Sequence, residues 1–545
     1  MKKEDKIAFL LILGFGILIW NPIFKIFYQQ EEWLGLGHIF IEGIKHPFVG
    51  VNFIQFIFGE DRSLARILGM IFFGYFRLNT FPAAVLSLFL HTVNSYFVFL
   101  LANKLTKNTL TSFLAGIIFL VSSVASNTVF WFGTSIGTLP ATTLILSACF
   151  IYFNYLEKEK SKFLVLTFLL LYISLFFKEI GVYLFILFPL ASLLFKKTKI
   201  STFFHIWWPF IAFFFAYLGV RIIELKSVQS EQALFLTGTS SHFISTLVVR
   251  AVLYPLTSFS LQFIPPQPLL VFARFFTNTY YPFYSPEEFN LIVQTAVLDL
   301  FAVGLSLVFL NVVFQWIKIL GKVQRNYMIF LILSSLLSFL PYIVISKSFS
   351  YLESRYYYLS LVFGSIIVSW FITYFLRFRY LFIKLVAAGA ILSFLFWHSS
   401  ILIKDIKQGV GVSNERRGFI LQLKTIIPTL KENKNIFYIT SDQDYYVLGN
   451  KIPFQGGVGY TLMVLYYDSK KIPSDFLAKD YLFVIGSEGY QESGDLGFGY
   501  FSKLDSLKKA VKANNLSKDI IIGLYYDSKT GKVVDITQKI LPEMH

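Results

Sequence analysis

Long runs of hydrophobic residues alternate with short charged segments along most of the 545-residue chain. A run that crosses a bilayer as a helix must span a hydrocarbon core of about 30 Å. Runs of this kind lie near residues 7–27, 81–103, 109–125, 138–156, 163–178, 180–195, 202–224, 291–316, 327–346, 357–376 and 381–403. The pattern predicts a polytopic α-helical membrane protein with about eleven transmembrane helices.

The pattern changes after about residue 404, where charge density rises and the apolar runs shorten to the length of strands. Candidate strands cover 436–439, 482–485 and 520–525, and amphipathic helices are expected over 417–431 and 503–514. The sequence therefore predicts two domains. A transmembrane domain covers 1–403, and a small soluble α/β domain covers 404–545.

Composition supports the membrane assignment and changes the meaning of the charge. The chain is 55% hydrophobic and 15% charged, with a mean hydropathy of +0.63. Its net charge of +16 comes from lysines and arginines in short loops between apolar runs, so the positive-inside rule explains it better than nucleic-acid binding. A single cysteine, Cys149, excludes an intrachain disulfide.

The distribution of these basic loops predicts the orientation. The amino terminus is expected in the cytoplasm, where the first run serves as an uncleaved signal anchor, and an odd number of spans then places the carboxy-terminal domain outside. Four features are expected at the outer face, namely the loop 28–80, the turn at Lys178 and Glu179, the loop 225–290 and the run around Arg355. Aromatic residues and prolines in 225–290 indicate amphipathic helices on the outer membrane surface.

The segment from Ser122 to Gly137 combines small polar residues with Trp131 and Phe132. Such a segment fits a re-entrant hairpin that faces protein or a cavity, and it equally fits a plain turn. The sequence leaves both interpretations open.

Two adjacent carboxylates, Glu31 and Glu32, follow the first run. Neighbouring side chains on a helix point about 100° apart, so only one of them is expected to face a central cleft. Either could act as a general base towards an acceptor hydroxyl, and either could simply be a solvated helix end.

Charged and polar residues also interrupt the apolar runs further along. Arg355 has a planar cationic fork suited to phosphate, and Tyr356 and Tyr358 beside it can donate hydrogen bonds or form part of an aromatic belt. Lys178 and Glu179 fit an interfacial ion pair or the lining of a polar vestibule. His91 and Asn94 share a helix face, and we expect an interhelical hydrogen bond from both.

In combination these elements resemble a family, the integral-membrane glycosyltransferases of the GT-C class, and in particular the branch of transmembrane O-mannosyltransferases with tetratricopeptide tails. The similar motifs occur in the same order over about residues 28–375: Arg62-Ser63-Leu64, Phe76-Arg77-Leu78-Asn79, Leu88-Phe89-Leu90-His91 with Asn94, Phe177-Lys178-Glu179, Val220-Arg221 and Glu353-Ser354-Arg355-Tyr356-Tyr357-Tyr358-Leu359-Ser360.

The chain departs from this family at three places. Its candidate catalytic pair is Glu31 and Glu32, where aspartates are commoner in the family. Where the family has His-Pro-x-His-x-Glu before a tryptophan, this chain has Ser122, Ser123, Ala125 and Asn127 before Trp131. The soluble domain also lacks tetratricopeptide spacing.

The resemblance implies transfer of a sugar from a polyprenyl-phosphate donor to an extracytoplasmic acceptor, with inversion at the anomeric carbon. Glu31 or Glu32 would activate the acceptor hydroxyl. The leaving phosphate would be bound by Arg355, Tyr356, Tyr358, Arg62 and Lys178, with Glu179, His91, Asn94 and Arg221 in support.

The implied partners are membrane lipids, the lipid-linked sugar and a glycan, lipid or protein acceptor, with no nucleic acid. A requirement for a divalent metal is left open, and the histidines show no metal-ligand spacing. Two alternatives to an enzyme are a transporter and a non-catalytic scaffold that presents the carboxy-terminal domain outside the cell. Charges that gather on one face and the absence of repeated halves weigh against a transporter.

Overall fold

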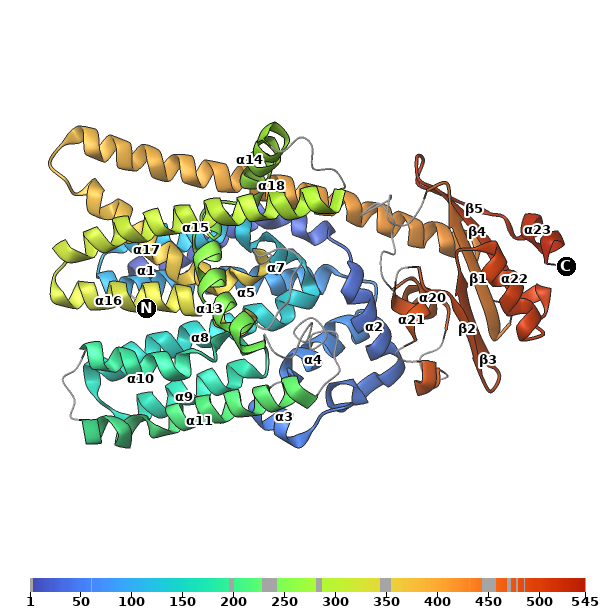
Figure 1. Cartoon of the computed structure of the whole chain (residues 1–545), viewed down its shortest axis with the longest axis horizontal. Helices are drawn as coiled ribbons and strands as arrows, with labels where there is room; N and C mark the ends of the chain where they lie inside the picture. Colours follow the sequence, from blue (N-terminus) through green and yellow to red (C-terminus); the bar gives the residue numbers. More distant parts are fainter. Residues whose placement is uncertain are drawn as a thin grey trace.

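The computed structural model describes residues 3–59, 61–195, 200–227, 243–280, 287–343, 354–430, 432–443, 457–467, 472–476, 479–484 and 486–544. Helices from α1 to α18 form one bundle, and a smaller sheet domain follows at its end (Figure 1). The helices before the sheet domain are α1 (Lys3–Trp20), η1 (Asn21–Lys25), α2 (Gln30–Glu42), η2 (Gly43–Phe48), α3 (Phe53–Phe58), α4 (Ser63–Gly69), η3 (Met70–Tyr75), α5 (Phe81–Thr106), α6 (Thr109–Val121), η4 (Ser123–Ala125), α7 (Ser126–Phe130), α8 (Phe132–Lys158), α9 (Ser161–Leu175), η5 (Glu179–Gly181), α10 (Leu184–Phe195), α11 (Ile200–Ser227), α13 (Phe243–Leu261), α14 (Pro266–Tyr280), α15 (Glu287–Ile319), α16 (Lys322–Leu337), η7 (Leu340–Tyr342), η8 (Ser354–Tyr356), α17 (Tyr358–Leu376) and α18 (Leu381–Ile426).

Eight helical segments of the described chain are long and apolar enough to cross a membrane. They are Asp5–Lys25, Phe81–Thr106, Phe132–Lys158, Ser201–Ile223, Ala296–Ile319, Lys322–Tyr342, Tyr358–Leu376 and the long helix Leu381–Ile426. A ninth span is formed if α6 and the η4–α7 segment, bent by 47°, are counted together. The chain is an integral membrane protein. Two further predicted spans correspond to the shorter apolar helices α9 and η5–α10, so the total of eleven stays a prediction.

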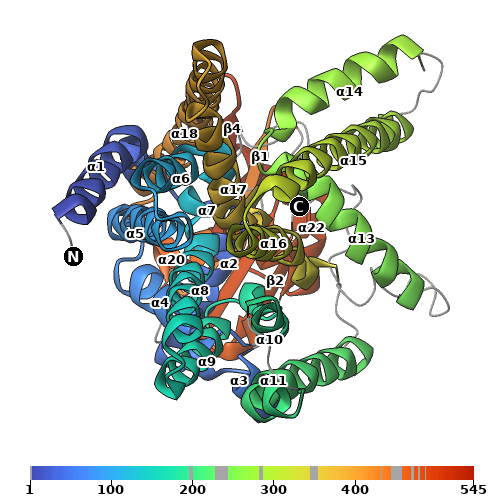
Figure 2. The ribbon, with the colours of Figure 1, turned by 90° about the vertical axis from the view of Figure 1, so that its left-hand side faces the viewer.

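Span α17 lies at the centre of the bundle. It is the most enclosed of the eight, with 72% of its apolar window buried, and α6, α16 and α18 pack against it (Figure 2). The outer helices instead expose large apolar side chains, among them Leu18, Leu300 and Phe396. Such exposure suits contact with lipid and would be costly over so wide an area in water.

The end of α13 is inserted between the spans. The hydroxyl of Ser260 donates to the carbonyl of Ala302 in α15 at 2.8 Å, and Gln262 donates to Ser335 in α16 at 3.1 Å. This differs from the expectation that 225–290 lies on the outer membrane surface. Small hydroxyl side chains at a helix interface allow close approach and hydrogen bonding across it, which an amphipathic pattern does not reveal.

Helix α18 joins the bundle to the sheet domain (Figure 1). It continues for 46 residues through the predicted boundary at 404. It ends at Ile426, because Ile427 precedes Pro428 and a residue before proline avoids the helical conformation.

The sheet domain contains a five-stranded sheet of order β2-β3-β1-β4-β5. Its elements are β1 (Lys434–Ser441), α20 (Val458–Tyr466), η11 (Ser474–Phe476), α21 (Asp480–Phe483), β2 (Gly489–Ser493), β3 (Leu496–Phe501), α22 (Leu504–Ala513), η12 (Lys518–Ile520), β4 (Ile521–Asp527), β5 (Lys532–Asp535), α23 (Thr537–Ile540) and η13 (Leu541–Glu543). The central strand β1 is parallel to β3 and β4, and antiparallel hairpins with β2 and β5 complete both edges. The predicted sheet domain with helices is confirmed.

Individual elements of this domain were predicted with mixed success. The strands over 436–439 and 520–525 and the helix over 503–514 correspond to β1, β4 and α22. The predicted strand 482–485 is wrong, because residues up to Phe483 form the short helix α21. A run of four apolar residues has too little periodicity to separate a helix from a strand.

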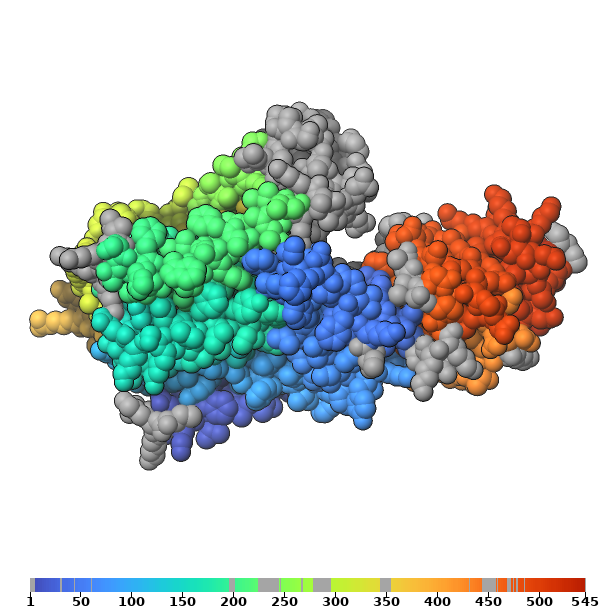
Figure 3. Space-filling view, turned by 90° about the horizontal axis from the view of Figure 1, so that it is seen from below, coloured from blue at the N-terminus to red at the C-terminus, as the bar shows by residue number. Residues whose placement is uncertain are grey.

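The sheet domain rests on the segment between α2 and η3. Figure 3 shows this blue segment directly against the orange lobe of the sheet domain. Helix α2 packs on α20, and a Cβ atom at Gly37 would come within 2.1 Å of the Tyr460 ring. Only glycine therefore permits this approach.

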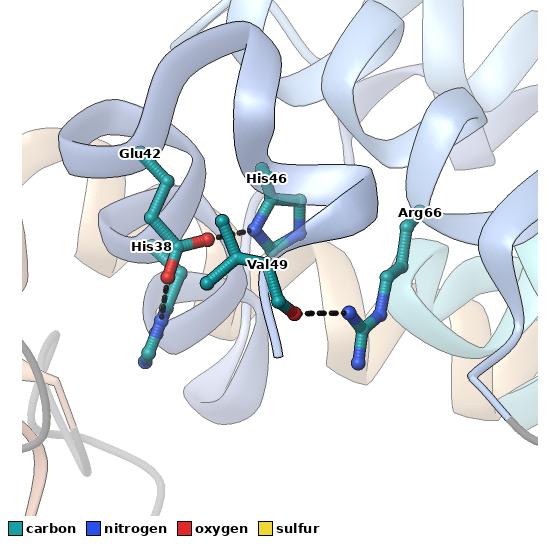
Figure 4. Close-up of polar contacts among 5 residues, drawn as sticks. All are labelled: His38, Glu42, His46, Val49 and Arg66. Carbon is teal, nitrogen blue, oxygen red and sulfur yellow. Dashed lines mark hydrogen bonds and ion pairs between the residues drawn. The ribbon is translucent and has the colours of Figure 1, made fainter. Parts of the chain in front are cut away.

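The same helix carries a partly buried carboxylate near this contact. The carboxylate of Glu42 bridges two rings, at 2.6 Å from Nδ1 of His46 and 3.4 Å from Nδ1 of His38, and Arg66 donates to the carbonyl of Val49 (Figure 4). The His38 ring also packs against Tyr460. These hydrogen bonds hold the chain from α2 to α4 in place where it packs against the sheet domain.

Candidate functional site

An ion pair joins two distant parts of the bundle. Arg62 precedes α4 with a left-handed backbone (φ 51°), and its Nε and Nη2 donate to the two carboxylate oxygens of Glu179 at 2.9 and 2.5 Å. The bidentate geometry orients both side chains. The predicted turn at Glu179 thus meets the loop that follows the first span.

Three more predicted cations surround this pair. Lys178 is buried and donates to Thr138 at 2.8 Å, and the charges of Arg62, Glu179 and Arg355 all act on it. The positive charge of Arg221 in α11 acts on the carboxylate of Glu179. We call Arg62, Lys178, Glu179, Arg221 and Arg355 the cationic cluster. It combines four basic side chains with one carboxylate.

Arg355 lies at the edge of the cluster and stacks on aromatic rings. Its Cζ atom is 4.5 Å from the centre of the Trp131 ring and 5.1 Å from that of Tyr356. The hydroxyl of Thr128 donates to the Arg355 carbonyl at 3.2 Å. Trp131 and Thr128 belong to the bent α6–α7 region, so this region holds the arginine in place.

A polar pocket of about 300 Å³ lies next to Trp131. Its walls come from the chain after η1, the η4–α7 segment, η8 and α18, and they include Gln29, Ser123, Val124, Ser126, Asn127, Phe130, Trp131, Pro265, Ser354, Asp405, Gln408, Gly409, Val412 and Arg416. Of the two predictions for 122–137, the structure favours a bent segment that faces a cavity. The pocket also adjoins the cationic cluster, because Ser354 lines it and Arg355 follows.

Sequence reasoning missed the polar residues that α18 contributes to this pocket. Asp405, Gln408, Val412 and Arg416 recur at spacings of three to four residues and therefore share one helix face. Asp405 accepts a long hydrogen bond of 3.4 Å from Ser126, and Arg416 donates to the carbonyl of Tyr28 at 3.2 Å. The periodicity was readable in the sequence, but the predicted domain boundary at 404 separated these residues from the spans.

Glu32 lies behind the wall of the polar pocket. It is 2% exposed, and its two oxygens accept hydrogen bonds from the backbone amides of Gly133 at 2.9 Å and Gln29 at 2.5 Å. Burial raises the pKa of Glu32 to about 7, against the effect of these amides and of the Arg416 charge. Glu32 thus caps α2 and ties it to the start of α8. The side chain of Glu31 lies outside the described residues.

The remaining predicted site residues form a separate group within the spans. The hydroxyl of Tyr358 lies 2.8 Å from Nδ1 of His91 and accepts a hydrogen bond from Asn94 at 3.3 Å. The other ring nitrogen of His91 is 3.2 Å from the carbonyl of Leu120. The expected interhelical hydrogen bonds of His91 and Asn94 are present. Tyr358 faces them, whereas Tyr356 faces the cationic cluster.

No set of three or more histidine, cysteine, aspartate or glutamate side chains within the described ranges is arranged to hold a metal ion. The basic and amide groups around the polar pocket instead suit anions and hydroxyl-rich ligands, because they supply many hydrogen-bond donors.

Comparison with known proteins finds similar solved structures but no matching sequence. No protein-family model and no curated protein sequence matches the chain. It is similar to the crystal structure of the oligosaccharyltransferase of Archaeoglobus fulgidus in the apo form, with a TM-score of 0.43 and 12% sequence identity over 83% of this chain and 64% of that chain. The archaeal oligosaccharyltransferase AglB from the same organism, in complex with an inhibitory peptide and a dolichol-phosphate, gives a TM-score of 0.40 and 12% identity, covering 83% of this chain and 63% of that chain. The chain thus spans less than two thirds of the length of either structure.

Proposed function

We propose that the protein is a GT-C-like glycosyltransferase, which moves a sugar from a polyprenyl-phosphate donor to an extracytoplasmic acceptor with inversion at the anomeric carbon. One observation carries the proposal. Four basic side chains gather around a single carboxylate, directly beside a polar pocket at one end of the membrane bundle.

The cationic cluster is suited to a phosphate that leaves as an anion. In a partly dry site, fixed cations stabilise developing negative charge more strongly than they would in water. Arg355 can reach such a group while its planar fork remains stacked on Trp131, and Arg62 is already oriented by Glu179. The donor lipid would reach this site from the bilayer, which gives a transferase a reason to have many spans.

The polar pocket is suited to the sugar and the acceptor hydroxyl. Its volume is at the lower end of the range for small-molecule sites, which is about 300–1,000 Å³, and Asn127, Gln408 and Asp405 offer hydrogen bonds. Trp131 both lines this pocket and contacts Arg355, so it adds an aromatic surface to the site. The sugar carbon would then lie between the phosphate and the attacking hydroxyl, as inversion requires.

A general base has to reach the acceptor hydroxyl within hydrogen-bond distance. The sequence suggested Glu31 or Glu32 for this role, and Glu32 has both oxygens engaged by backbone amides. Asp405 lines the pocket, and it accepts a long hydrogen bond from Ser126. We therefore include Asp405 beside Glu31 and Glu32 as a candidate base. Glu32 would in that case position the wall of the pocket.

The first experiment identifies lipids bound to the purified protein by mass spectrometry. We expect polyprenyl phosphate or its sugar conjugate with the wild type, and much less of it with Arg355→Ala. The matched control is Arg379→Ala, which changes an exposed arginine in the loop after α17. Equal retention of the lipid by both variants would contradict the phosphate contact.

The second experiment measures sugar transfer from labelled polyprenyl-phosphate donors. Loss of a general base typically costs a factor of about 10² to 10⁴ in rate, so Asp405→Asn should retain the lipid and lose transfer to this extent. Loss in Glu32→Gln alone would assign the base to Glu32. Bound lipid without transfer by the wild type, across all donors and acceptors tried, would favour the non-catalytic scaffold.

A further inference from the structure

A second pocket lies beside α2, and its walls are mostly apolar. Its volume is about 440 Å³. Its walls are formed by α2 and the chain after it, by η3 and by α20, and they include Leu36, Ile39, Phe40, Gly43, Met70, Ile71, Phe73, Gly74, Tyr75, Arg77 and Val464. Arg77 is the single charged side chain among these lining residues.

The backbone around this pocket has two unusual features. Met70–Tyr75 forms a π-helical segment, a rare conformation that is frequent at functional sites. Arg77 has a left-handed backbone with φ 47°, which is uncommon for a residue with a Cβ atom. The carbonyl of Arg77 accepts a hydrogen bond from the hydroxyl of Tyr28, which fixes this conformation.

The pocket opens next to a membrane span. Span α5 begins four residues after Arg77, and its Phe81, Val85 and Phe89 recur every fourth residue with large exposed surfaces. Ile71 and Tyr75 at the pocket are exposed as well, Tyr75 by 80%. The exposed apolar side chains of α5 and those at the pocket thus lie within one short stretch of the chain, Ile71 to Phe89. The mouth of the pocket is therefore at the level where hydrocarbon chains meet headgroups.

The charge at the mouth indicates the kind of lipid. The guanidinium of Arg77 is exposed and lies 5.9 Å from the ring of Phe40, and none of the ion pairs between described residues includes it. A cation at the surface of a membrane attracts anionic headgroups. An apolar cavity beside it can take up a hydrocarbon chain from the bilayer without leaving buried polar groups unpaired.

We propose that this pocket is a binding site for an anionic glycerophospholipid, with one acyl chain in the cavity between α2 and η3 and the phosphate at Arg77. The site is separate from the polar pocket, since the two share no lining residue. A bound chain would contact Val464 in α20 and would thereby join the membrane surface to the sheet domain.

The test uses photo-crosslinking in vesicles of phosphatidylcholine. A phosphatidylglycerol with a diazirine on one acyl chain is added to one sample, and the phosphatidylcholine with the same diazirine chain is added to another at an equal fraction. Labelled peptides are identified by mass spectrometry. We expect labels on Ile39, Met70 and Phe73, with about a fivefold preference for phosphatidylglycerol, which is the effect of one surface cation.

Two variants separate the headgroup from the chain. Arg77→Gln should abolish the preference for phosphatidylglycerol and retain some labelling, and Arg379→Gln is its matched control. Ile71→Trp fills the cavity from an exposed position and should reduce labelling by both lipids, whereas Ile222→Trp on the exposed surface of α11 should not.

The proposal is overturned if labels occur only on the outer surfaces of the spans, or if both lipids label the pocket equally in the wild type. Retention of polyprenyl phosphate is measured in the same samples as an independent readout. If polyprenyl phosphate does not bind, the result for phosphatidylglycerol is unaffected. If phosphatidylglycerol does not label the pocket, the result for polyprenyl phosphate is unaffected.

Discussion

Glu32 and Gly133, which are 101 residues apart in the chain, are joined by a 2.9 Å hydrogen bond from the backbone amide of Gly133 to the Glu32 carboxylate. This bond connects the first helix outside the membrane to the start of span α8. A Cβ atom at Gly133 would lie 3.3 Å from the Glu32 side chain, so the approach is close. The walls of the polar pocket depend on this contact, because Gln29 and Trp131 lie on either side of it.

Stability should depend on pH through Glu32. Its pKa rises from 4.5 to about 7 in the folded protein, chiefly because of burial. The folded state therefore binds the proton more tightly than the unfolded chain does. The stabilisation is complete below about pH 4.5 and is lost as the pH rises to about 7. Thermal unfolding in detergent between these values should show a falling midpoint.

Glu32→Gln should remove this part of the pH dependence, because an amide does not titrate. The variant also loses one of the two hydrogen bonds from backbone amides, at a cost of about 1–3 kcal/mol. Glu432→Gln, in an exposed position before β1, serves as the control and should keep the wild-type slope. An unchanged slope in Glu32→Gln would show that other groups are responsible.

The ion pair between Arg62 and Glu179 should contribute little to stability. The Arg62 side chain is 46% exposed although that of Glu179 is only 16% exposed, so water reaches the pair from the arginine side, and pairs in contact with water typically contribute about 0.2–1 kcal/mol. We expect a coupling energy within this range from a double-mutant cycle with Arg62→Gln and Glu179→Gln. A coupling of several kcal/mol would mean that water does not screen the pair. The role of Glu179 would then be to hold the fold together and not to orient Arg62.

Tyr356 and Tyr358 should respond differently to loss of the hydroxyl. Tyr358→Phe leaves buried groups of His91 and Asn94 without their partner, which should lower stability by about 1–3 kcal/mol and leave retention of the lipid phosphate unchanged. Tyr356→Phe should have the smaller effect on stability. If Tyr358→Phe instead releases the lipid from a protein that remains stable, Tyr358 would bind the lipid phosphate, as predicted from the sequence.

The long membrane helices could be predicted from the sequence, because a bilayer requires long apolar runs and each run can be recognised without knowledge of the others. The cationic cluster was also predictable. Lys178, Glu179 and Arg355 interrupt or border such a run, and a charge there requires a partner. Arg62 and Arg221 were named because their motifs resemble those of the GT-C family.

The polar pocket could not be predicted to the same extent. Asp405 and Arg416 follow the last apolar run, where the charge density rises although the helix continues to Ile426, so the change in composition indicated a new domain and not a continued helix. The hydrogen bond from Gly133 to Glu32 joins a backbone amide to a distant side chain, and sequence periodicity contains no information on such a contact. The edge strands β2 and β5 were missed because their turns are short and their burial is partial.

The orientation in the membrane can be tested by cysteine labelling. The one native cysteine, Cys149, is buried and should give little background. Lys529→Cys lies in the exposed turn between β4 and β5, and Lys162→Cys lies near the start of α9 in a predicted cytoplasmic loop. In sealed vesicles of known orientation, an impermeant maleimide should label Lys529→Cys from outside only and Lys162→Cys only after the membrane is opened. Labelling of both only after the membrane is opened would mean that an even number of spans separates Lys162 from the sheet domain. The polar pocket would then face the cytoplasm, where a sugar donor need not be lipid-linked.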